Sequence, residues 1–412
     1  MNNLAINDLF ADRIGGKNFK NNISIYKFEN IKKNRNKLIN ENSKLSLIDL
    51  GVGEPNILTD MGIINTLNCE SKKFKNCGYA DNGILEFNIS ASNYLKNVFN
   101  VDNINPENEV IHIIGSKSAL ALLPLAFINP NDITLTTIPG YPVISTITKW
   151  IGGKVYPLPL YKSNNFLPDL NNIPDNILKR AKLLYINYPN NPTGATASTE
   201  FFKRVVDFGL KHNILIIHDA AYSAITFDST SPLSFLSVPN AKNIGIEIHS
   251  LSKSYSMTGW RIGFIAGNKD IIKAYSFIKE NTDSGQFKAI QLSAKYALEH
   301  PEITKNLANI YSRRHDKLIN ILKKLGFNVS KPKASFYLYV PIPKAIKNGP
   351  IFYNAEDFSN YLMIEKRILC VPWDDTGSYI RLSVTFPAKS IEEEDKIIKD
   401  IYNRLKNTKF IF

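Results

Sequence analysis

The sequence predicts an α/β protein with a mostly parallel central sheet in a large domain, followed by a smaller α+β domain. From about residue 46 to 285, short apolar stretches alternate with helical patterns, as expected for a parallel sheet buried on both faces. After residue 286 the pattern changes to long helices and a few further strands. A chain of 412 residues is long enough for two such domains.

The expected strands of the large domain are rich in Ile, Leu and Val, and turn signals bound them. Helices are expected at 117–128 and 201–212, where the apolar residues recur at helical spacing. The expected strands are EVIHIIG (109–115), DITLTTI (132–138), KLLYINYP (182–189), NILIIHD (213–219) and GIEIHS (245–250).

The small domain is expected to begin with a helical region at 286–325 and to end with a helix at 390–406. Residues 1–45 are interpreted as an N-terminal arm that belongs to the small domain, with a polar helix around 25–38. The predicted division is therefore 1–45 for the arm, 46–285 for the large domain and 286–412 for the small domain. Between its terminal helices the small domain is expected to hold strands ASFYLYVPI, RILCVP and YIRLSVTF and a helix at 355–366.

The composition favours a cytoplasmic protein without a membrane span. No run of 18 apolar residues occurs, and the first residues lack the basic and apolar segments of a secretory signal. Cys69, Cys77 and Cys370 have no metal-type spacing and are expected to be reduced thiols. The net charge of +13 admits nucleic-acid binding as a distant alternative. The lysines are scattered among asparagines without a recognition motif, so no nucleic-acid partner is expected.

Polar residues follow the predicted strands, and ligands of open parallel sheets bind beyond the carboxyl ends of strands. Ser116 and Lys117 open a helix after the first strand, where free backbone N–H groups can bind a phosphate. An ordinary strand–helix turn is the alternative. Tyr141 lies in a turn between two prolines and is either a packing aromatic or a flat surface for a ring.

The next three strand ends carry an amide, a carboxylate and an amine. Asn191 precedes a proline, which keeps it out of helical geometry and directs it towards the crevice. Asp219 ends an apolar strand, where a carboxylate is costly without a cation, although a helix N-cap is the alternative. Lys253 follows the last strand, and Arg261 lies just beyond. A lysine amine, a buried carboxylate, a flat aromatic and a phosphate cradle together suit pyridoxal 5'-phosphate.

These motifs, in this order, resemble those of fold-type I pyridoxal-phosphate aminotransferases over nearly the whole chain. The resemblance rests on GYP (140–142), NNPTG (190–194), DAAY (219–222), SLSK (250–253) and the following Arg261. It implies that Lys253 forms the Schiff base and shuttles the proton, and that Asp219 pairs with the pyridinium nitrogen. It also implies that Asn191 and Tyr222 hydrogen-bond the phenolic oxygen while Tyr141 stacks on the ring.

The resemblance further implies a phosphate site and a homodimer. Tyr79, in GYADNG, matches a tyrosine that reaches the cofactor phosphate of the neighbouring subunit in this family. The residues expected to hold the phosphate within one chain are Ser116, Lys117, Ser250, Ser252 and Arg261.

Arg381 is the candidate for the substrate α-carboxylate, because a guanidinium fork matches a carboxylate bidentately and an arginine among apolar strand residues is unusual. A polar position in a half-exposed strand is the alternative. The family resemblance supports the first interpretation and places Gly53, of DLGVGEPN, beside the same carboxylate. The expected substrate-binding residues are Gly53, Lys117, Tyr141, Asn191 and Arg381.

A finer resemblance is to the archaeal-type branch of the LL-diaminopimelate aminotransferases, in segments such as DLGVGEPN, GYADNGI, HDAAYSA and VPWDD. It implies amino transfer from LL-2,6-diaminopimelate to 2-oxoglutarate, giving tetrahydrodipicolinate and glutamate, in lysine and peptidoglycan precursor biosynthesis. An aminotransferase for alanine, aspartate or an aromatic amino acid is the alternative. The loops that hold Glu54, Asp81, Asn82 and Lys117 are candidates for the distal end of the substrate. DSGQF (283–287) departs from the Asn-Gly segment of the plant and chlamydial branch, which contacts the substrate of the neighbouring subunit, so Ser284 or Gln286 is the expected substitute for that contact.

Overall fold

The structure is a computed structural model that describes residues 9–19 and 45–412. The polar helix expected around 25–38 lies outside the described residues. Within the described part of the arm, two short 3-10 turns form, η2 (Asp12–Ile14) and η3 (Gly16–Asn18).

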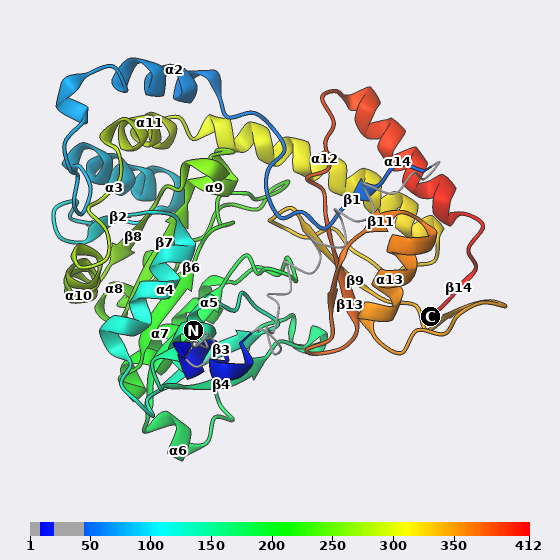
Figure 1. Cartoon of the computed structure of the whole chain (residues 1–412), viewed down its shortest axis with the longest axis horizontal. Helices are drawn as coiled ribbons and strands as arrows, with labels where there is room; N and C mark the ends of the chain where they lie inside the picture. The colour runs from blue at the N-terminus through cyan, green and yellow to red at the C-terminus, as the bar shows by residue number, and fades with distance from the viewer. Residues whose placement is uncertain (1–8, 20–44) are drawn as a thin grey trace, which may run out of the picture.

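A seven-stranded sheet with the order β2-β8-β7-β6-β5-β3-β4 forms the centre of the large domain (Figure 1). The pairs from β7 through β4 are parallel, whereas β8 runs antiparallel to both β2 and β7. The predicted mostly parallel α/β sheet is therefore confirmed. The strands are β2 (Val110–Ile113), β3 (Ile133–Ile138), β4 (Lys154–Pro159), β5 (Ala181–Asn187), β6 (Leu215–Asp219), β7 (Gly245–Ser250) and β8 (Gly263–Gly267).

The sequence did not predict β4 and β8. The edge strand β4 is mostly exposed or half-buried and contains two prolines, which weakens its strand signal. The buried strand β8 is short and has glycine at both ends.

Helices cover both faces of the sheet, which explains why its inner strands are buried along almost their whole length. The helices on one face are α4 (Ser116–Phe127), α5 (Val143–Trp150) and α10 (Lys269–Glu280). Those packed on the other face are α3 (Leu85–Phe99), α7 (Thr199–His212), α8 (Ala241–Ile244) and α11 (Lys288–Glu299). Short helices α6 (Asp175–Leu178) and α9 (Leu251–Ser254) follow β4 and β7.

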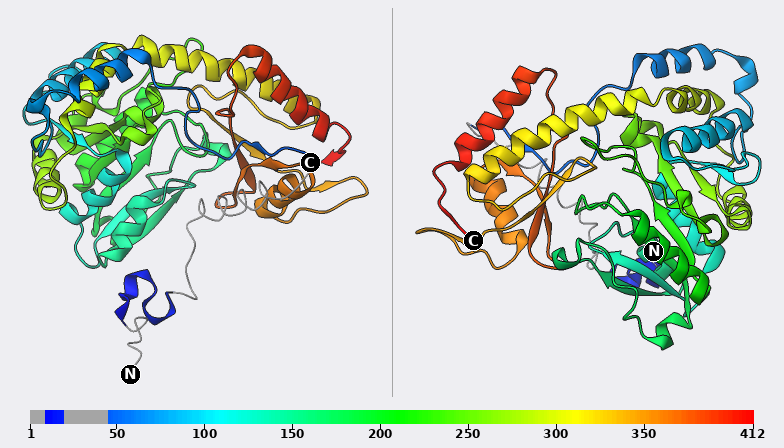
Figure 2. Two further views of the ribbon diagram at one scale, coloured as in Figure 1. Left: turned by 45° about the horizontal axis from the view of Figure 1, so that its top comes forward. Right: turned by 180° about the vertical axis from the view of Figure 1, so that it is seen from behind.

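The small domain has a three-stranded antiparallel sheet in the order β12-β13-β9. Figure 2 shows α12 extending from the large domain to the small one, where α14 lies beside it. The elements are α12 (Glu302–Lys324), β9 (Tyr337–Pro341), β10 (Ala345–Ile346), α13 (Ala355–Glu365), β11 (Ile368–Leu369), β12 (Val371–Trp373), β13 (Tyr379–Ser383), α14 (Ile391–Leu405) and β14 (Phe410–Ile411).

Two segments pack with the other domain than the one to which the sequence analysis assigned them. β1 (Ile48–Asp49), assigned to the large domain, pairs in parallel with β11 of the small domain. α11, assigned to the small domain, packs against α3 and α2 (Met61–Glu70) of the large one. The chain between β1 and α2 therefore passes from one domain to the other, and this crossing brings residues 51–54 to the site described next.

No helix in the described ranges is long and apolar enough to cross a membrane.

Candidate active site

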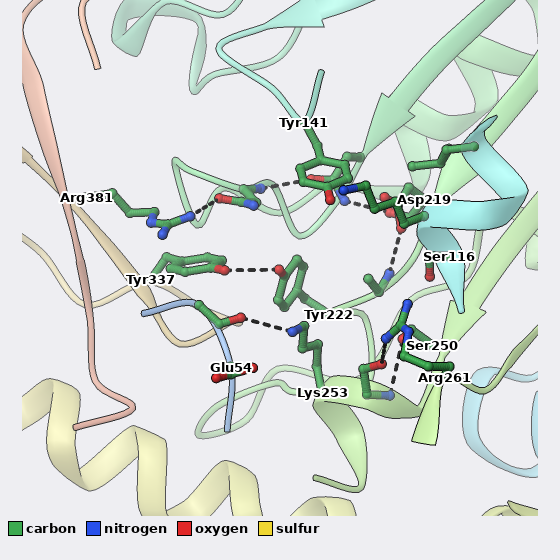
Figure 3. A pocket seen from close by; sticks show the side chains of 17 residues that line it. Glu54, Ser116, Tyr141, Asp219, Tyr222, Ser250, Lys253, Arg261, Tyr337 and Arg381 are labelled. Atoms are coloured by element: carbon green, nitrogen blue, oxygen red, sulfur yellow. Dashed lines mark hydrogen bonds between the residues drawn. The ribbon is translucent and has the colours of Figure 1, made fainter. Parts of the chain in front are cut away.

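A cavity of about 400 Å³ lies at the carboxyl ends of β5, β6 and β7, facing β13 of the small domain. Figure 3 shows Arg381 on one side of it, Arg261, Ser250 and Ser116 on the other, and Lys253 and Tyr222 between them. All the residues expected to hold the cofactor or the α-carboxylate line this cavity except Tyr79, whereas the candidates for the distal end of the substrate are divided, as described below. The lining residues are Gly53, Glu54, Ser116, Lys117, Leu120, Tyr141, Asn187, Asn191, Asp219, Ala221, Tyr222, Ser250, Ser252, Lys253, Arg261, Tyr337 and Arg381.

Lys253 is held in the middle of the cavity by the turn of α9 that follows β7. Its Nζ donates a hydrogen bond of 2.9 Å to the carbonyl of Gly53. Desolvation lowers the pKa of Lys253 to about 8; Glu54 opposes this shift, while the positive charges of Arg261 and Arg381 add to it. A large fraction of this amine is therefore neutral near pH 8, as a nucleophile or base requires.

Asp219 ends β6 and is 5 % exposed. Burial raises the pKa of its carboxyl group, and hydrogen bonds oppose the shift: the backbone N–H of Ala221 donates to Oδ1 and the Tyr185 hydroxyl to Oδ2, both at 3.2 Å. These neutral donors do not supply the cation that a buried carboxylate favours. Because Asp219 lines the cavity, a protonated nitrogen of a bound ring fits beside it.

The side of the cavity lined by Ser116 and Arg261 offers donors suited to a phosphate. α4 begins at Ser116, so its first backbone N–H groups face this end. The buried Ser116 Oγ has no hydrogen-bond partner among the described residues. Arg261 Nη1 donates to the carbonyl of Thr258 at 2.8 Å, which fixes the guanidinium. Gly115 has a φ of +76°, and a Cβ there would collide with that guanidinium.

Arg381 is 1 % exposed and connects both domains at the other end of the cavity. It donates from Nη1 to Asn191 Oδ1 and from Nη2 to the carbonyl of Gly51, each at 2.8 Å. Its guanidinium carbon lies 4.2 Å from the centre of the Tyr337 ring, close enough for a cation–π interaction. Asn191 thus uses its side-chain oxygen to position Arg381, an interaction that the sequence did not predict.

Tyr337 was also missed by the sequence analysis. Its hydroxyl lies 3.1 Å from the Tyr222 hydroxyl, and burial raises the pKa of Tyr222 well above its ordinary value, so Tyr222 stays a neutral hydroxyl. A Cβ at Gly53 would collide with the Tyr337 hydroxyl, which explains a glycine at this position. In the sequence Tyr337 is one aromatic among several in ASFYLYVPI, with no signal that separates it from the others.

Tyr79 is 81 % exposed and lies outside the cavity of its own chain. The loop that carries it is fixed by the buried Lys279, whose Nζ donates to the carbonyl of Asp81 at 2.7 Å and to Asp283 Oδ1 at 2.6 Å. Gly285, with a φ of +85°, lies directly against the Asp81 backbone. A rigid loop therefore presents this exposed tyrosine away from the chain.

The candidates for the distal end of the substrate divide into two groups. Glu54 and Lys117 line the cavity, whereas Asp81, Asn82 and Ser284 do not. Gln286 does not either, because its amide group donates to the carbonyls of Trp260 at 2.7 Å and Arg261 at 3.0 Å. Within its own chain this side chain supports the backbone at Arg261. The expected contact of Ser284 or Gln286 is with the substrate of the neighbouring subunit, and it stays a prediction.

The fold and the cavity together define an aminotransferase. Residues 46–401 match the model of the aminotransferase class I and II family, and the chain belongs to that family. Its fold is that of the fold-type I aminotransferases. A substrate-bound BacF structure from Bacillus subtilis is 30 % identical, covers 98 % of each chain and superposes with a TM-score of 0.87.

Two relatives match almost the whole chain. The LL-diaminopimelate aminotransferase of Methanocaldococcus jannaschii is 51 % identical, with 97 % of each chain covered. That of Methanococcus maripaludis is 48 % identical, with 99 % of each covered.

Proposed function

We propose that this aminotransferase acts on LL-2,6-diaminopimelate and 2-oxoglutarate and interconverts them with tetrahydrodipicolinate and glutamate, in lysine and peptidoglycan precursor biosynthesis. The observation that carries the substrate assignment is the 51 % identity over 97 % of both chains to an LL-diaminopimelate aminotransferase. The observation that carries the chemistry is the position of Lys253 in one cavity with Asp219 and Arg381.

The proposed cofactor is pyridoxal 5'-phosphate, which when bound supplies an aldehyde and a ring that accepts electrons. The buried carboxylate of Asp219 suits a protonated ring nitrogen, and Ser116 Oγ suits a phosphate oxygen. Tyr141 is proposed to stack on the ring, while Tyr222 and the amide of Asn191 donate to its phenolic oxygen. The residues proposed to hold the phosphate are Ser116, Lys117, Ser250, Ser252 and Arg261.

In this proposal the ε-amine of Lys253 moves the substrate proton. Its Nζ is oriented by the carbonyl of Gly53 and has a pKa of about 8, so it can take up a proton from the substrate α-carbon and return it. Arg381 fixes the other side of that carbon by binding the α-carboxylate, which places the α-proton within reach of Lys253. Gly53 leaves room for the carboxylate beside Tyr337.

We also propose a cytoplasmic homodimer in which Tyr79 completes the phosphate site of the partner subunit. The exposure of Tyr79 on a loop that Lys279 fixes supports this arrangement.

A donor panel tests the substrate assignment. The protein is assayed with 2-oxoglutarate and LL-diaminopimelate, meso-diaminopimelate, alanine, aspartate or an aromatic amino acid. A site that pairs with a distal amino-carboxylate leaves its own polar groups unsatisfied when that end is absent, so truncated donors are expected to react ~10⁴-fold less efficiently. The meso isomer should also be poor, because its distal groups point differently. If alanine or an aromatic donor reacts faster, the substrate assignment is wrong and the aminotransferase assignment stands.

A Lys117 variant distinguishes two proposed roles of this residue, which are binding of the cofactor phosphate and binding of the distal end of the substrate. A loss confined to diaminopimelate in Lys117→Ala, with unchanged cofactor affinity, would place it at the distal end. A loss of cofactor affinity would place it at the phosphate.

A further inference from the structure

Three ionisable side chains are buried behind Asp219, on the opposite face of the sheet. His218 and Glu247 are 0 % exposed and His249 is 5 % exposed. His218 of β6 is the register partner of Glu247 of β7, so their side chains share one face. Because successive side chains of a strand point to opposite faces, Asp219 faces the cavity while His218 points away from it. The cavity residues do not include these three.

Both ring nitrogens of His218 face acceptors. Nε2 lies 2.9 Å from the carbonyl of Tyr188, which can only accept, so Nε2 carries a hydrogen. Nδ1 lies 2.9 Å from Glu247 Oε2. The proton in that second contact belongs either to His218, which is then an imidazolium, or to Glu247.

The other neighbours of Glu247 place this proton on His218. The backbone N–H of Phe235 donates to Oε2 at 2.6 Å, the Ser234 hydroxyl donates to Oε1 at 2.8 Å, and His249 Nε2 lies 2.5 Å from Oε1. A carboxylate accepts such bonds more strongly than a carboxylic acid. Burial alone would raise the pKa of Glu247, but the charges and hydrogen bonds of His249 and His218 outweigh burial and hold this pKa well below its ordinary value.

We propose that Glu247 holds His218 as an imidazolium, and that this buried cation keeps Asp219 ionised from the opposite face of the sheet. His218 is a positioning residue, since it lies outside the cavity and acts through its neighbour. The inference deepens the proposed function, because an ionised Asp219 is what a protonated cofactor ring requires.

Of the other groups that face Asp219, two are neutral and one acts in the same direction as His218. Tyr185 of β5 donates a neutral hydrogen bond to it, and Tyr222, in the turn after β6, is a neutral hydroxyl. His249 of β7 acts on Asp219 in the same direction as His218. Its ring stacks on Phe264 at 4.8 Å and shares the carboxylate of Glu247. On its own face, His218 is enclosed by Glu247 and the rings of Phe202 and Phe235.

The first test measures the protonation of His218 in the apoenzyme by ¹⁵N NMR of labelled histidine, with the His218→Gln spectrum for assignment. His218 should show an imidazolium signal at pH 8, and Glu247→Gln should convert it to a neutral ring. His315 is the internal control, because it is fully buried and desolvation lowers its pKa to about 3, so it should stay neutral. A neutral His218 in the wild-type apoenzyme at pH 8 would overturn the proposal.

The second test measures the pKa of Asp219 by ¹³C NMR of labelled aspartate in the apoenzyme, assigned with Asp219→Asn. Removal of a nearby cation raises a carboxyl pKa. His218→Gln is therefore expected to shift the Asp219 titration to higher pH. The acid limit of pyridoxal phosphate binding should move up by the same amount.

His315→Gln is the matched control, because it replaces another buried histidine, which lies in α12. It should leave the Asp219 titration and the acid limit of pyridoxal phosphate binding unchanged. If His218→Gln lowers thermal stability but leaves the Asp219 titration in place, the network is only structural and the proposal fails. Neither measurement uses an amino donor, so failure of the substrate assignment would be recognised separately in the donor panel.

Discussion

Replacement of Arg381 by lysine should show how much the planar shape of the guanidinium, as distinct from its positive charge, contributes to binding of the substrate α-carboxylate. Lysine keeps the positive charge but replaces a planar fork of five N–H donors by a point charge with three. Arg381 already donates to Asn191 and to the Gly51 carbonyl, each at 2.8 Å, while its guanidinium lies over Tyr337. A guanidinium can hold both internal acceptors and a substrate carboxylate together, whereas an ammonium must give up at least one of them.

The expected loss follows from the bonds that lysine cannot make. A hydrogen bond to a charged group contributes about 1.5–3 kcal/mol, and the stacking on Tyr337 contributes about 0.5–2 kcal/mol more. A net loss of about 2–4 kcal/mol corresponds to a decrease in kcat/KM of about 30- to 1,000-fold. Because every donor has an α-carboxylate, the same factor is expected with LL-diaminopimelate and with glutamate.

The assay is steady-state kinetics with both donors, together with cofactor affinity. Arg313→Lys is the matched control, because Arg313 forms a comparable two-pronged contact of 2.9 Å per bond with Glu394 in the small domain, away from the cavity. It should lower stability slightly and leave kcat/KM unchanged. A loss in Arg381→Lys limited to one donor, or an unchanged kcat/KM, would refute the carboxylate assignment.

Three further results are expected. Lys253→Ala should bind pyridoxal phosphate without a borohydride-reducible covalent adduct; an adduct that persists would show that another amine reacts. Covalent capture of the cofactor by the wild-type apoenzyme should rise with pH through about 8 and then level off, because the amine is neutral above its pKa; a rise centred near 10 would contradict the desolvation argument. Mixed dimers of Tyr79→Ala and Lys253→Ala subunits should recover one intact site, and a mixture no more active than the separate variants would contradict a shared site.

The strand ends were predictable from the sequence because the carboxyl ends of parallel strands meet at one edge of a sheet. Any polar side chain that follows such a strand, as Asn191, Asp219 and Lys253 do, is therefore brought to a common place. The inner strands β3, β5, β6 and β7 were also predictable, since burial on both faces favours segments rich in Ile, Leu and Val. β4 carries two prolines at the edge and gives no such signal.

Contacts made across the domains could not be predicted in the same way. The position of Tyr337 above Gly53 depends on how the small domain docks, which no local pattern encodes. The crossing of β1 to pair with β11 likewise depends on a pairing between residues far apart in the sequence. The contacts that Gln286 makes within its own chain were not predictable for another reason: an amide in a loop suits a ligand and a backbone carbonyl equally well, and the structure shows it donating to the carbonyls of Trp260 and Arg261.

Insertions and deletions should be tolerated very unequally along this chain. α7 ends at His212, Asn213 turns the chain with a φ of +53°, and β6 begins at Leu215. If one residue added in that short turn shifted the register of β6 by one position, the two faces of the strand would be exchanged. The imidazole of His218 would then point into the cavity, and the carboxylate of Asp219 would lie against Phe202 and Phe235. Related chains are therefore expected to differ in length at exposed loops such as 161–172, and to keep the distance from α7 to β6 fixed.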